Sequence, residues 1–119
     1  MLPLGQYNHP TTTIRKFSGR LDAHTNLQVE QLISEAEQGR CDHVILNFSE
    51  ITVIDLGGIG QLFVWYHNLK AHRIRLSIVN PQPLVRVVLE SSHLLELIPI
   101  YQSIPEAIGG VSRPSFSLG

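Results

Sequence analysis

The apolar residues of this chain follow two patterns that take turns along the sequence. The first pattern is typical of β-strands. An apolar run at residues 44–48 continues at residues 51–54, which predicts a buried strand and its exit. Residues 11–17 are rich in β-formers and alternate imperfectly, so they predict an earlier strand that ends at Gly19. Two later strands are expected, the second limited to the sheet edge by a proline, at residues 75–80 and 98–101.

The second pattern, in which apolar residues stand three and four positions apart, predicts helices between these strands. The first helix has one apolar stripe, formed by Val29, Leu32, Ile33 and Ala36. Thr25 is expected to cap its first turn with Gln28 as reciprocal partner, and Gly39 is expected to end it. Ser103 and Glu106 form a second capping-box pattern. Besides the central helix, two shorter helices are expected at residues 84–92 and 105–108.

The central helix, expected at about residues 56–72, carries two separate stripes. The apolar stripe predicted to face the sheet consists of Ile59, Leu62, Phe63, Tyr66 and Leu69. Separations of four, three and four residues place another set on a single face turned away from the core, namely Gly57, Gln61, Val64 and Asn68. An exposed valine among small and polar residues suits a contact surface, so we expect this face to bind a partner.

Strands linked by helices imply crossover connections, so the chain is expected to be an α/β protein. The prediction is a single domain at residues 1–108, with a mixed, mostly parallel sheet of four to five strands and four helices. Residues 1–10 are expected to add at most a short edge strand. Residues 109–119 read GGVSRPSFSLG and predict a flexible C-terminal tail.

The corner between the central strand and the central helix, residues 55–60, has the sequence DLGGIG. The first backbone N–H groups of a helix have no partner within the helix, and Asp55 is expected to accept hydrogen bonds from them as the N-cap residue. The glycines leave the turn almost without side chains. A phosphate or the backbone of another protein can approach such a turn closely, so the function is expected to lie here.

Composition narrows the classes of function. The net charge is −1 and the nine Lys and Arg residues are scattered, so neither nucleic acid nor an anionic membrane is an expected partner. A single cysteine, Cys41, excludes an internal disulfide framework and a CxxC site, which favours a reducing compartment. No stretch approaches the roughly 20 apolar residues of a membrane span, and the N-terminus lacks signal-peptide features. A cytoplasmic protein without direct membrane insertion is therefore expected.

The sequence offers little that could support catalysis. The glycine corner lacks the third spaced glycine and the Lys-Ser/Thr pair of a phosphate-binding loop. His67 and His72 are five positions apart and cannot form the i, i+4 pair of a zinc helix. Trp65 and Tyr66 are expected to pack in or near the core, because no basic residues interleave with them. We therefore expect no enzyme activity, no cofactor and no metal.

Three segments together resemble the STAS domain of bacterial anti-sigma-factor antagonists over about residues 12–108: GRLDAHT, VILNFSEITVIDLGGIGQL and LSIVNPQPLVRVVLESSHLLELIPIYQSIPEAI. The family pattern at the corner is Asp-Ser-Ser-Gly-Leu-Gly or close to it. Asp55, Gly58 and Gly60 match this pattern, and both serines are replaced. The second serine, which the anti-sigma kinase phosphorylates in the family, corresponds to Gly57. His93 stands where the family usually has glycine, so that turn is expected to be strained.

The resemblance implies a non-enzymatic interaction module that binds an anti-sigma factor or a serine kinase-like regulator in a partner-switching system. Without a hydroxyl at Gly57, either the module binds constitutively or control lies elsewhere, for example at Ser49 or Thr52. Two alternatives stay open: an accessory STAS subunit of a lipid or other ABC-type transport assembly, and a small nucleotide-binding domain. The expected partner-binding residues are Asp55, Leu56, Gly57, Gly58, Gln61, Val64 and Asn68.

Overall fold

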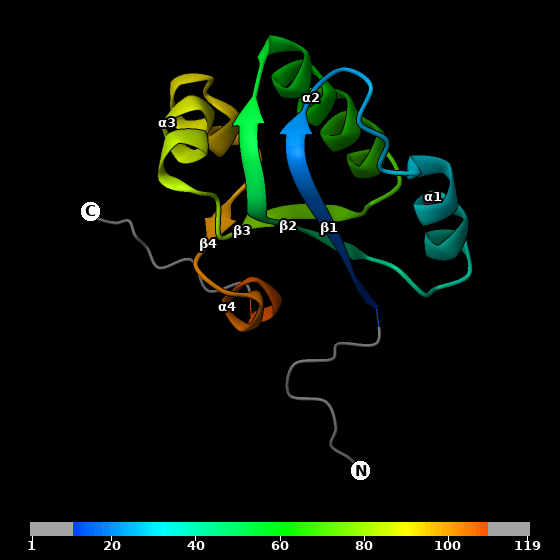
Figure 1. The fold of residues 1–119 in the computed structure, drawn as a ribbon. Coiled ribbons are helices and arrows are strands. Elements are labelled where there is room, and N and C mark those ends of the chain that lie inside the picture. Colours follow the sequence, from blue (N-terminus) through cyan, green and yellow to red (C-terminus); the bar gives the residue numbers. More distant parts are fainter. Residues whose placement is uncertain (1–10, 110–119) are drawn as a thin grey trace.

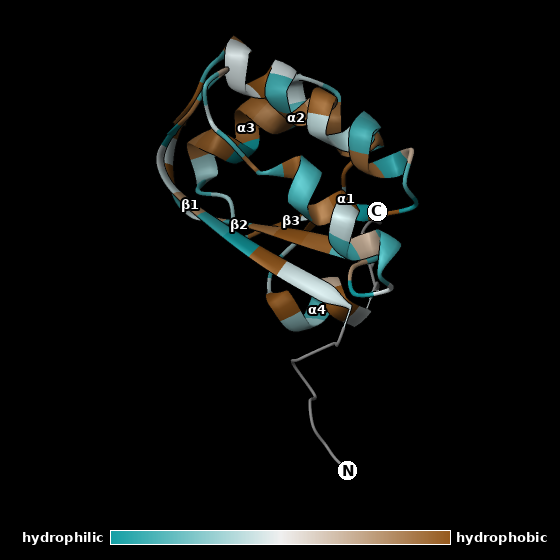
Figure 2. Ribbon diagram, turned by 90° about the vertical axis from the view of Figure 1, so that its right-hand side faces the viewer, coloured by the Kyte–Doolittle hydropathy of each residue, from teal (hydrophilic) through white to brown (hydrophobic). Residues whose placement is uncertain are grey.

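The computed structural model describes residues 11–109, which form one sheet with helices on both of its faces (Figure 1). All strand pairs are parallel, and the strand order is β1-β2-β3-β4. The helices α1, α2 and α3 cover one face, and α4 lies on the other (Figure 2). In chain order the elements are β1 (Thr12–Leu21), α1 (Val29–Glu37), β2 (His43–Ile54), α2 (Leu56–Lys70), β3 (Arg75–Val79), α3 (Pro83–Ser91), the 3-10 turn η1 (Leu94–Glu96), β4 (Ile100–Tyr101) and α4 (Ile104–Gly109).

The predicted α/β class is confirmed, with four strands and four α-helices in the described part of the chain. The sheet is wholly parallel there, so no antiparallel strand makes it mixed. The last strand lies at the sheet edge, as Pro99 predicts. The expected flexible tail lies outside the described residues except for Gly109, which ends α4, and so does the expected short edge strand at residues 1–10.

Each face of the sheet has its own hydrophobic core. The larger core lies between the sheet and α1, α2 and α3, and its fully buried side chains include Phe48, Leu62, Leu69 and Leu89. The smaller core, under α4, consists of Ile45, Val79, Tyr101 and Ala107. Strand β2 supplies buried side chains to both cores, which explains why its first part, residues 44–46, is apolar without alternation.

Strand β1 is longer than predicted, because Gly19 does not end it. Gly19 has a φ of +79° and lies at an irregular register with β2, where the strand continues to Leu21. A glycine in a left-handed conformation is typical of a β-bulge, which bends a strand without ending it. The extension has a structural consequence, because β3 pairs with β2 only as far as Asn47. Beyond that point β2 has β1 as its single described strand neighbour.

The predicted cap of α1 is wrong. The Thr25 hydroxyl accepts a hydrogen bond from the Asp22 N–H at 3.0 Å, and the Thr25 N–H donates to the Asp22 carbonyl at 3.1 Å. These two bonds close a turn directly after β1, so the hydroxyl is used before the helix begins. The residue that precedes α1 is Gln28, which has a φ of 59° and makes no side-chain capping bond.

The second capping-box pattern is confirmed with a shift of one residue. The Ser103 hydroxyl accepts a hydrogen bond from the Glu106 N–H at 3.2 Å, as expected of an N-cap. The Glu106 carboxylate reaches back to the N–H of Gln102 at 3.0 Å, one residue before the cap. Together these bonds hold the start of α4 close to the end of β4.

The turn after α3 contains the expected strain. His93 adopts a φ of 65°, a left-handed conformation that residues with a Cβ atom resist. Its ring Nδ1 lies 3.2 Å from a carboxylate oxygen of Glu96, and both side chains are more than 70% exposed. A pair so exposed to water contributes little to stability, so the strain at His93 is not offset by this contact.

We therefore expect His93→Gly to raise the free energy of unfolding by about 0.5–1 kcal/mol, the relief of left-handed strain less the greater flexibility of glycine in the unfolded chain. Urea denaturation followed by circular dichroism would measure the change. Glu96→Gln serves as the control, because it removes the ion pair and leaves the backbone of His93 strained. A less stable His93→Gly protein would contradict this account.

Candidate functional site

Asp55 caps α2, as the sequence predicts. One oxygen of its carboxylate accepts a hydrogen bond from the Gly58 N–H at 2.9 Å, and its main-chain carbonyl accepts from the Ile59 N–H at 3.0 Å. The other carboxylate oxygen lies 3.1 Å from Nη1 of Arg20, near the end of β1. This partner is not apparent from the sequence, because Arg20 is separated from Asp55 by 35 positions. The two contacts together fix the orientation of the carboxylate at the start of the helix.

The three glycines of the corner lie in different surroundings. A Cβ atom added to Gly58 would overlap the carbonyl oxygen of Leu21 and lie 2.8 Å from the Leu21 carbonyl carbon. A Cβ atom on Gly57 would lie 3.0 Å from the backbone nitrogen of Ala23, whereas one on Gly60 would meet no atom within 4 Å. The end of β1 and the loop after it therefore cover Gly57 and Gly58, and the turn is less open than its sequence suggests.

The predicted outer face of α2 lies next to the loop before α1. The Gln61 side-chain amide donates hydrogen bonds to the carbonyl oxygens of Thr25 at 2.7 Å and Ala23 at 3.3 Å. Val64 is 52% exposed, and Asn68 is also exposed. With Gln61 these two residues border an open hollow of about 660 Å³ between α1 and α2. The face is accessible at Val64 and Asn68, whereas Gln61 is partly used to hold the loop.

A group of exposed apolar side chains surrounds the same corner on the side of α3. Its members are Leu56, Leu84, Val87 and Val53, which are 88%, 79%, 56% and 43% exposed. We call these four residues the corner patch. Val53 and Leu84 line one shallow hollow, and Ile54, two residues before Leu56, lines it as well. Large exposed apolar side chains that gather in one region of a soluble protein are typical of a binding surface, so the corner patch is the strongest candidate for a contact surface.

The topology explains why the corner patch is exposed. The carboxyl half of β2 extends past the end of β3, and α3 lies beside it (Figure 1). The Gln82 side-chain amide, just before α3, donates to the Ser49 carbonyl at 3.0 Å and holds α3 against β2. Helix α3 buries Val85 and Leu89 against the core, which leaves Leu84 and Val87 on its outer side.

Of the corner patch, only Leu56 was predicted from the sequence as a contact residue, and the other three members were not. A signal was present in α3, whose sequence PLVRVVLES has apolar residues on more than one side of the helix. A helix with apolar residues on several sides needs cover on several sides. The core can cover only one side of α3, so the apolar residues on its other side predict a contact with something outside the core.

Within residues 11–109, no three His, Cys, Asp or Glu side chains are grouped so that they could hold a metal ion. None of the helices described here is both long and apolar enough to cross a membrane.

Several known proteins are similar to this chain. The sequence profile of the STAS domain family matches residues 6–107. The chain is 28% identical over 108 residues to the anti-sigma F factor antagonist of Paenibacillus polymyxa, and the match covers 90% of this chain and 92% of that protein. It is 34% identical over 85 residues to the anti-sigma F factor antagonist of Lysinibacillus sphaericus, covering 71% of this chain and 72% of the relative.

A transporter shares a shorter segment. High affinity sulfate transporter 2 of Stylosanthes hamata is 32% identical over 78 residues, which are 63% of this chain and 12% of the transporter. Two solved structures share the fold. The anti-sigma factor antagonist SpoIIAA in its unphosphorylated form aligns over 88% of this chain and 94% of its own, with a TM-score of 0.59 and 23% identity. The protein TM1081 aligns over 87% of this chain and 83% of its own, with a TM-score of 0.70 and 22% identity.

Proposed function

This chain belongs to the STAS domain family, and we propose that it is a non-enzymatic interaction module of the anti-sigma factor antagonist type. Its partner is an anti-sigma factor or a related serine kinase-like regulator. The similarity to an antagonist over 92% of that protein supports this type of function. The observation that carries the proposal is the corner patch, a set of apolar side chains left in water beside the glycine corner.

The corner patch has the composition of a binding surface. Interfaces between proteins are dominated by a few apolar side chains that become fully desolvated at the centre, surrounded by polar contacts. Leu56 and Leu84 are the most exposed of the large apolar residues described, and they would supply the centre. Arg20 and Asp55 lie beside them as an ion pair about half exposed to water, which suits the polar margin.

The proposed interface also includes the outer face of α2. Asp55 fixes the direction in which α2 begins, because it caps the helix and pairs with Arg20. In this arrangement the partner covers the corner and extends along the helix. The proposed contact residues are Asp55, Leu56, Gly57, Gly58, Gln61, Val64 and Asn68, together with Val53, Leu84 and Val87.

The two alternatives are less well supported. A role as an accessory transport subunit rests on sulfate transporters in which the similar segment is a small part of the whole, 12% in the Stylosanthes protein. A nucleotide-binding role needs backbone N–H groups open to a phosphate at the corner. The contacts of Gly57 and Gly58 with Ala23 and Leu21 leave little space for one.

The test of this proposal begins with capture of the partner from native cells and its identification by mass spectrometry. Calorimetry would then compare the wild-type chain with Leu56→Asp and with Leu84→Asp. We expect each variant to bind about a hundredfold more weakly or worse, because an unpaired carboxylate would be desolvated at the centre of the interface. Both side chains are more than three-quarters exposed, so the fold is expected to persist, which circular dichroism would verify.

Ser34→Asp is the matched control, because it places the same charge on an exposed position of α1 outside the corner patch. We expect its affinity to equal that of the wild type. If Leu56→Asp and Leu84→Asp bind as tightly as Ser34→Asp, the corner patch is not the interface. The family membership would then inform the fold and not the mode of binding.

Regulation provides a separate prediction. The corner has no hydroxyl group between Asp55 and Gly60, so incubation with the partner kinase and ATP is expected to add no phosphate there. Mass spectrometry of peptides would check this. Gly57→Ser is the matched variant, since its Cβ requires movements of only a few tenths of an ångström, and it is expected to gain phosphate if the partner is a serine kinase. Phosphate at Ser49 or Thr52 of the wild type would contradict a constitutive module and move the switch to β2.

A further inference from the structure

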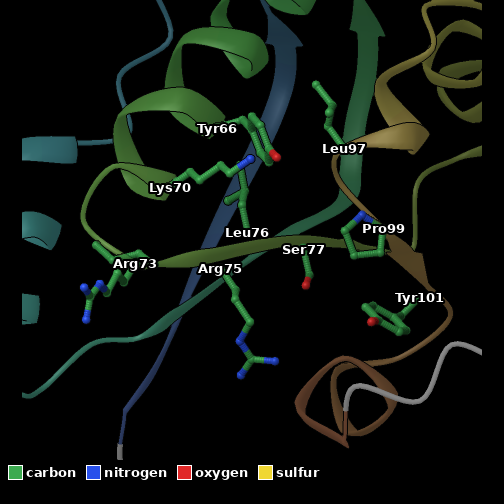
Figure 3. Close-up of a pocket in the computed structure, with 10 residues that line it drawn as sticks. Tyr66, Lys70, Arg73, Arg75, Leu76, Ser77, Leu97, Pro99 and Tyr101 are labelled. Atoms are coloured by element: carbon green, nitrogen blue, oxygen red, sulfur yellow. The ribbon is translucent and has the colours of Figure 1, made fainter.

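A cavity of about 360 Å³ lies at the edge of β3, away from the corner (Figure 3). Strand β4 pairs only with Ile78 and Val79, so among residues 11–109 no strand lies beside the first part of β3 on this side. The end of α2 and residues 97–101 border the gap. Helix α2 runs from the corner to this cavity, and its fifteen residues at 1.5 Å each separate the two places by roughly 20 Å. The cavity is therefore distinct from the proposed interface.

Positive charge is concentrated around this cavity. Lys70, Arg73 and Arg75 line it, and no acidic side chain does. None of these three cations forms an ion pair with a carboxylate of the described residues. Lys16, Arg20 and Arg86, in contrast, are each paired with a carboxylate at 2.8–3.1 Å. In a chain with a net charge of −1, a hollow whose charged lining residues are all cations without an ion pair to a described carboxylate favours an anionic ligand.

One side of the cavity combines a cation with a hydroxyl group. Figure 3 shows Arg75 and Tyr101 on the same side of β3. The Tyr101 side chain is largely buried at 8% exposure, and its hydroxyl makes no hydrogen bond to any described residue, so the hydroxyl is free to donate to a ligand. The neighbouring Ser77 hydroxyl lies 2.7 Å from Nε2 of His43 and is already engaged. The guanidinium of Arg75 and the Tyr101 hydroxyl are thus the groups available to hold a carboxylate or phosphate.

The other side of the cavity is apolar. Figure 3 shows Leu76 on the opposite side of β3 from Arg75, together with Tyr66, and Leu97 and Pro99 complete the lining there. The Lys70 ammonium lies 5.5 Å from the centre of the Tyr66 ring and so covers an aromatic surface. Ligand sites typically pair such apolar walls with a few polar groups that fix the orientation, in volumes of roughly 300–1,000 Å³. The cavity has both features.

We propose that this cavity binds a small organic anion, a carboxylate or a phosphate ester with an apolar body. The charged head lies at Arg75 and the Tyr101 hydroxyl, and the apolar body crosses the edge of β3 that β4 does not cover to reach Leu76, Tyr66 and Leu97 on the other side. Arg is well suited to this head group, because its planar guanidinium can make two parallel hydrogen bonds to either oxyanion. The domain would then carry a ligand site at one end of α2 and a protein interface at the other.

The experiment is a titration of the ¹⁵N-labelled full chain followed by amide chemical shifts. The probes are octanoate and octyl phosphate. Octanol is the control that has the alkyl chain but no charge, and acetate and inorganic phosphate are the controls that have the charged group but no long alkyl chain. We expect saturable shifts of residues 75–77 and 97–101 at about 1 mM octanoate or octyl phosphate. The probe that binds more tightly shows whether the site prefers a carboxylate or a phosphate ester. Octanol, acetate and inorganic phosphate are expected to bind at least about tenfold more weakly, because octanol lacks the anionic group and the two small anions lack the apolar chain.

Variants locate the site. Arg75→Gln is expected to weaken binding about fivefold or more, and Tyr101→Phe, which removes only the hydroxyl, is expected to weaken it measurably. Arg40→Gln is the matched control, since Arg40 is an exposed, unpaired cation that does not line the cavity. The proposal is overturned if neither anion gives saturable shifts up to about 10 mM, if octanol binds equally well, or if Arg40→Gln loses as much affinity as Arg75→Gln.

Discussion

Replacing Gly58 by alanine is expected to destabilise the fold by about 3 kcal/mol, near the upper end of what overpacking usually costs. The added methyl group would overlap the carbonyl oxygen of Leu21 and press against the Ile54 side chain. Neither neighbour can move freely, because Leu21 is fully buried at the end of β1 and its carbonyl also accepts the Asp55 N–H at 3.4 Å. Relief of the clash would separate α2 from β1. Urea denaturation followed by circular dichroism would measure the loss.

Gly60→Ala is the control for this prediction, since it makes the same chemical change two residues later in the same helix. A Cβ atom there meets nothing within 4 Å, and alanine is the better helix former. We expect Gly60→Ala to stabilise the protein by about 0.5–1 kcal/mol. Similar losses at both positions would show that the corner needs glycine for backbone conformation and not for the approach of β1.

Truncation of Leu62 to alanine is expected to cost about 3–4 kcal/mol. Leu62 is 0% exposed at the centre of α2 and belongs to the larger core, so its removal leaves a cavity that the surrounding helices and sheet cannot fill. A domain of this size is typically stable by only about 5–15 kcal/mol, so the variant is expected to melt far below the wild type. Chemical denaturation with a shared slope for both proteins would give the difference.

Phe63 and Val64, the next two residues of α2, serve as controls for Leu62 because they are less buried. The sequence pattern places Phe63 in the core with Leu62, but the structure leaves Phe63 only partly buried against it. Phe63→Ala is therefore expected to cost less than Leu62→Ala, and Val64→Ala, at a half-exposed position, is expected to change stability by less than about 0.5 kcal/mol. A loss at Phe63 that exceeds the loss at Leu62 would mean that the helix is rotated from the orientation described here.

The sequence by itself determined the features that depend on neighbouring residues. Periodic apolar positions fixed the α/β class, the order of the elements and most of the core-facing side of α2, because a helix or a strand repeats at a constant interval. Asp55 was identifiable as the N-cap of α2 since its partner, Gly58, lies three positions away. The strain at His93 was likewise a local property of one turn.

Local rules also account for the errors. Thr25 and Gln28 have the spacing of a capping box, yet the Thr25 hydroxyl accepts from Asp22, an equally near donor on its other side. Gly19 has the composition of a strand end, yet pairing with β2 carries the strand past it. In both places two structures were available to the same residues, and contacts with the rest of the fold selected one of them.

Only the tertiary structure decided what surrounds the functional corner. The sequence does not state that the carbonyl of Leu21 lies against Gly58, since the two are far apart in the chain and meet only when β1 pairs with β2. The sequence likewise does not show that Leu56 and Leu84 stay exposed, since this depends on how α2 and α3 pack against the sheet. The spacing of apolar residues along a helix or a strand predicts which side chains can be buried. Which of them stay in water is set by the lengths and positions of elements that are distant in sequence.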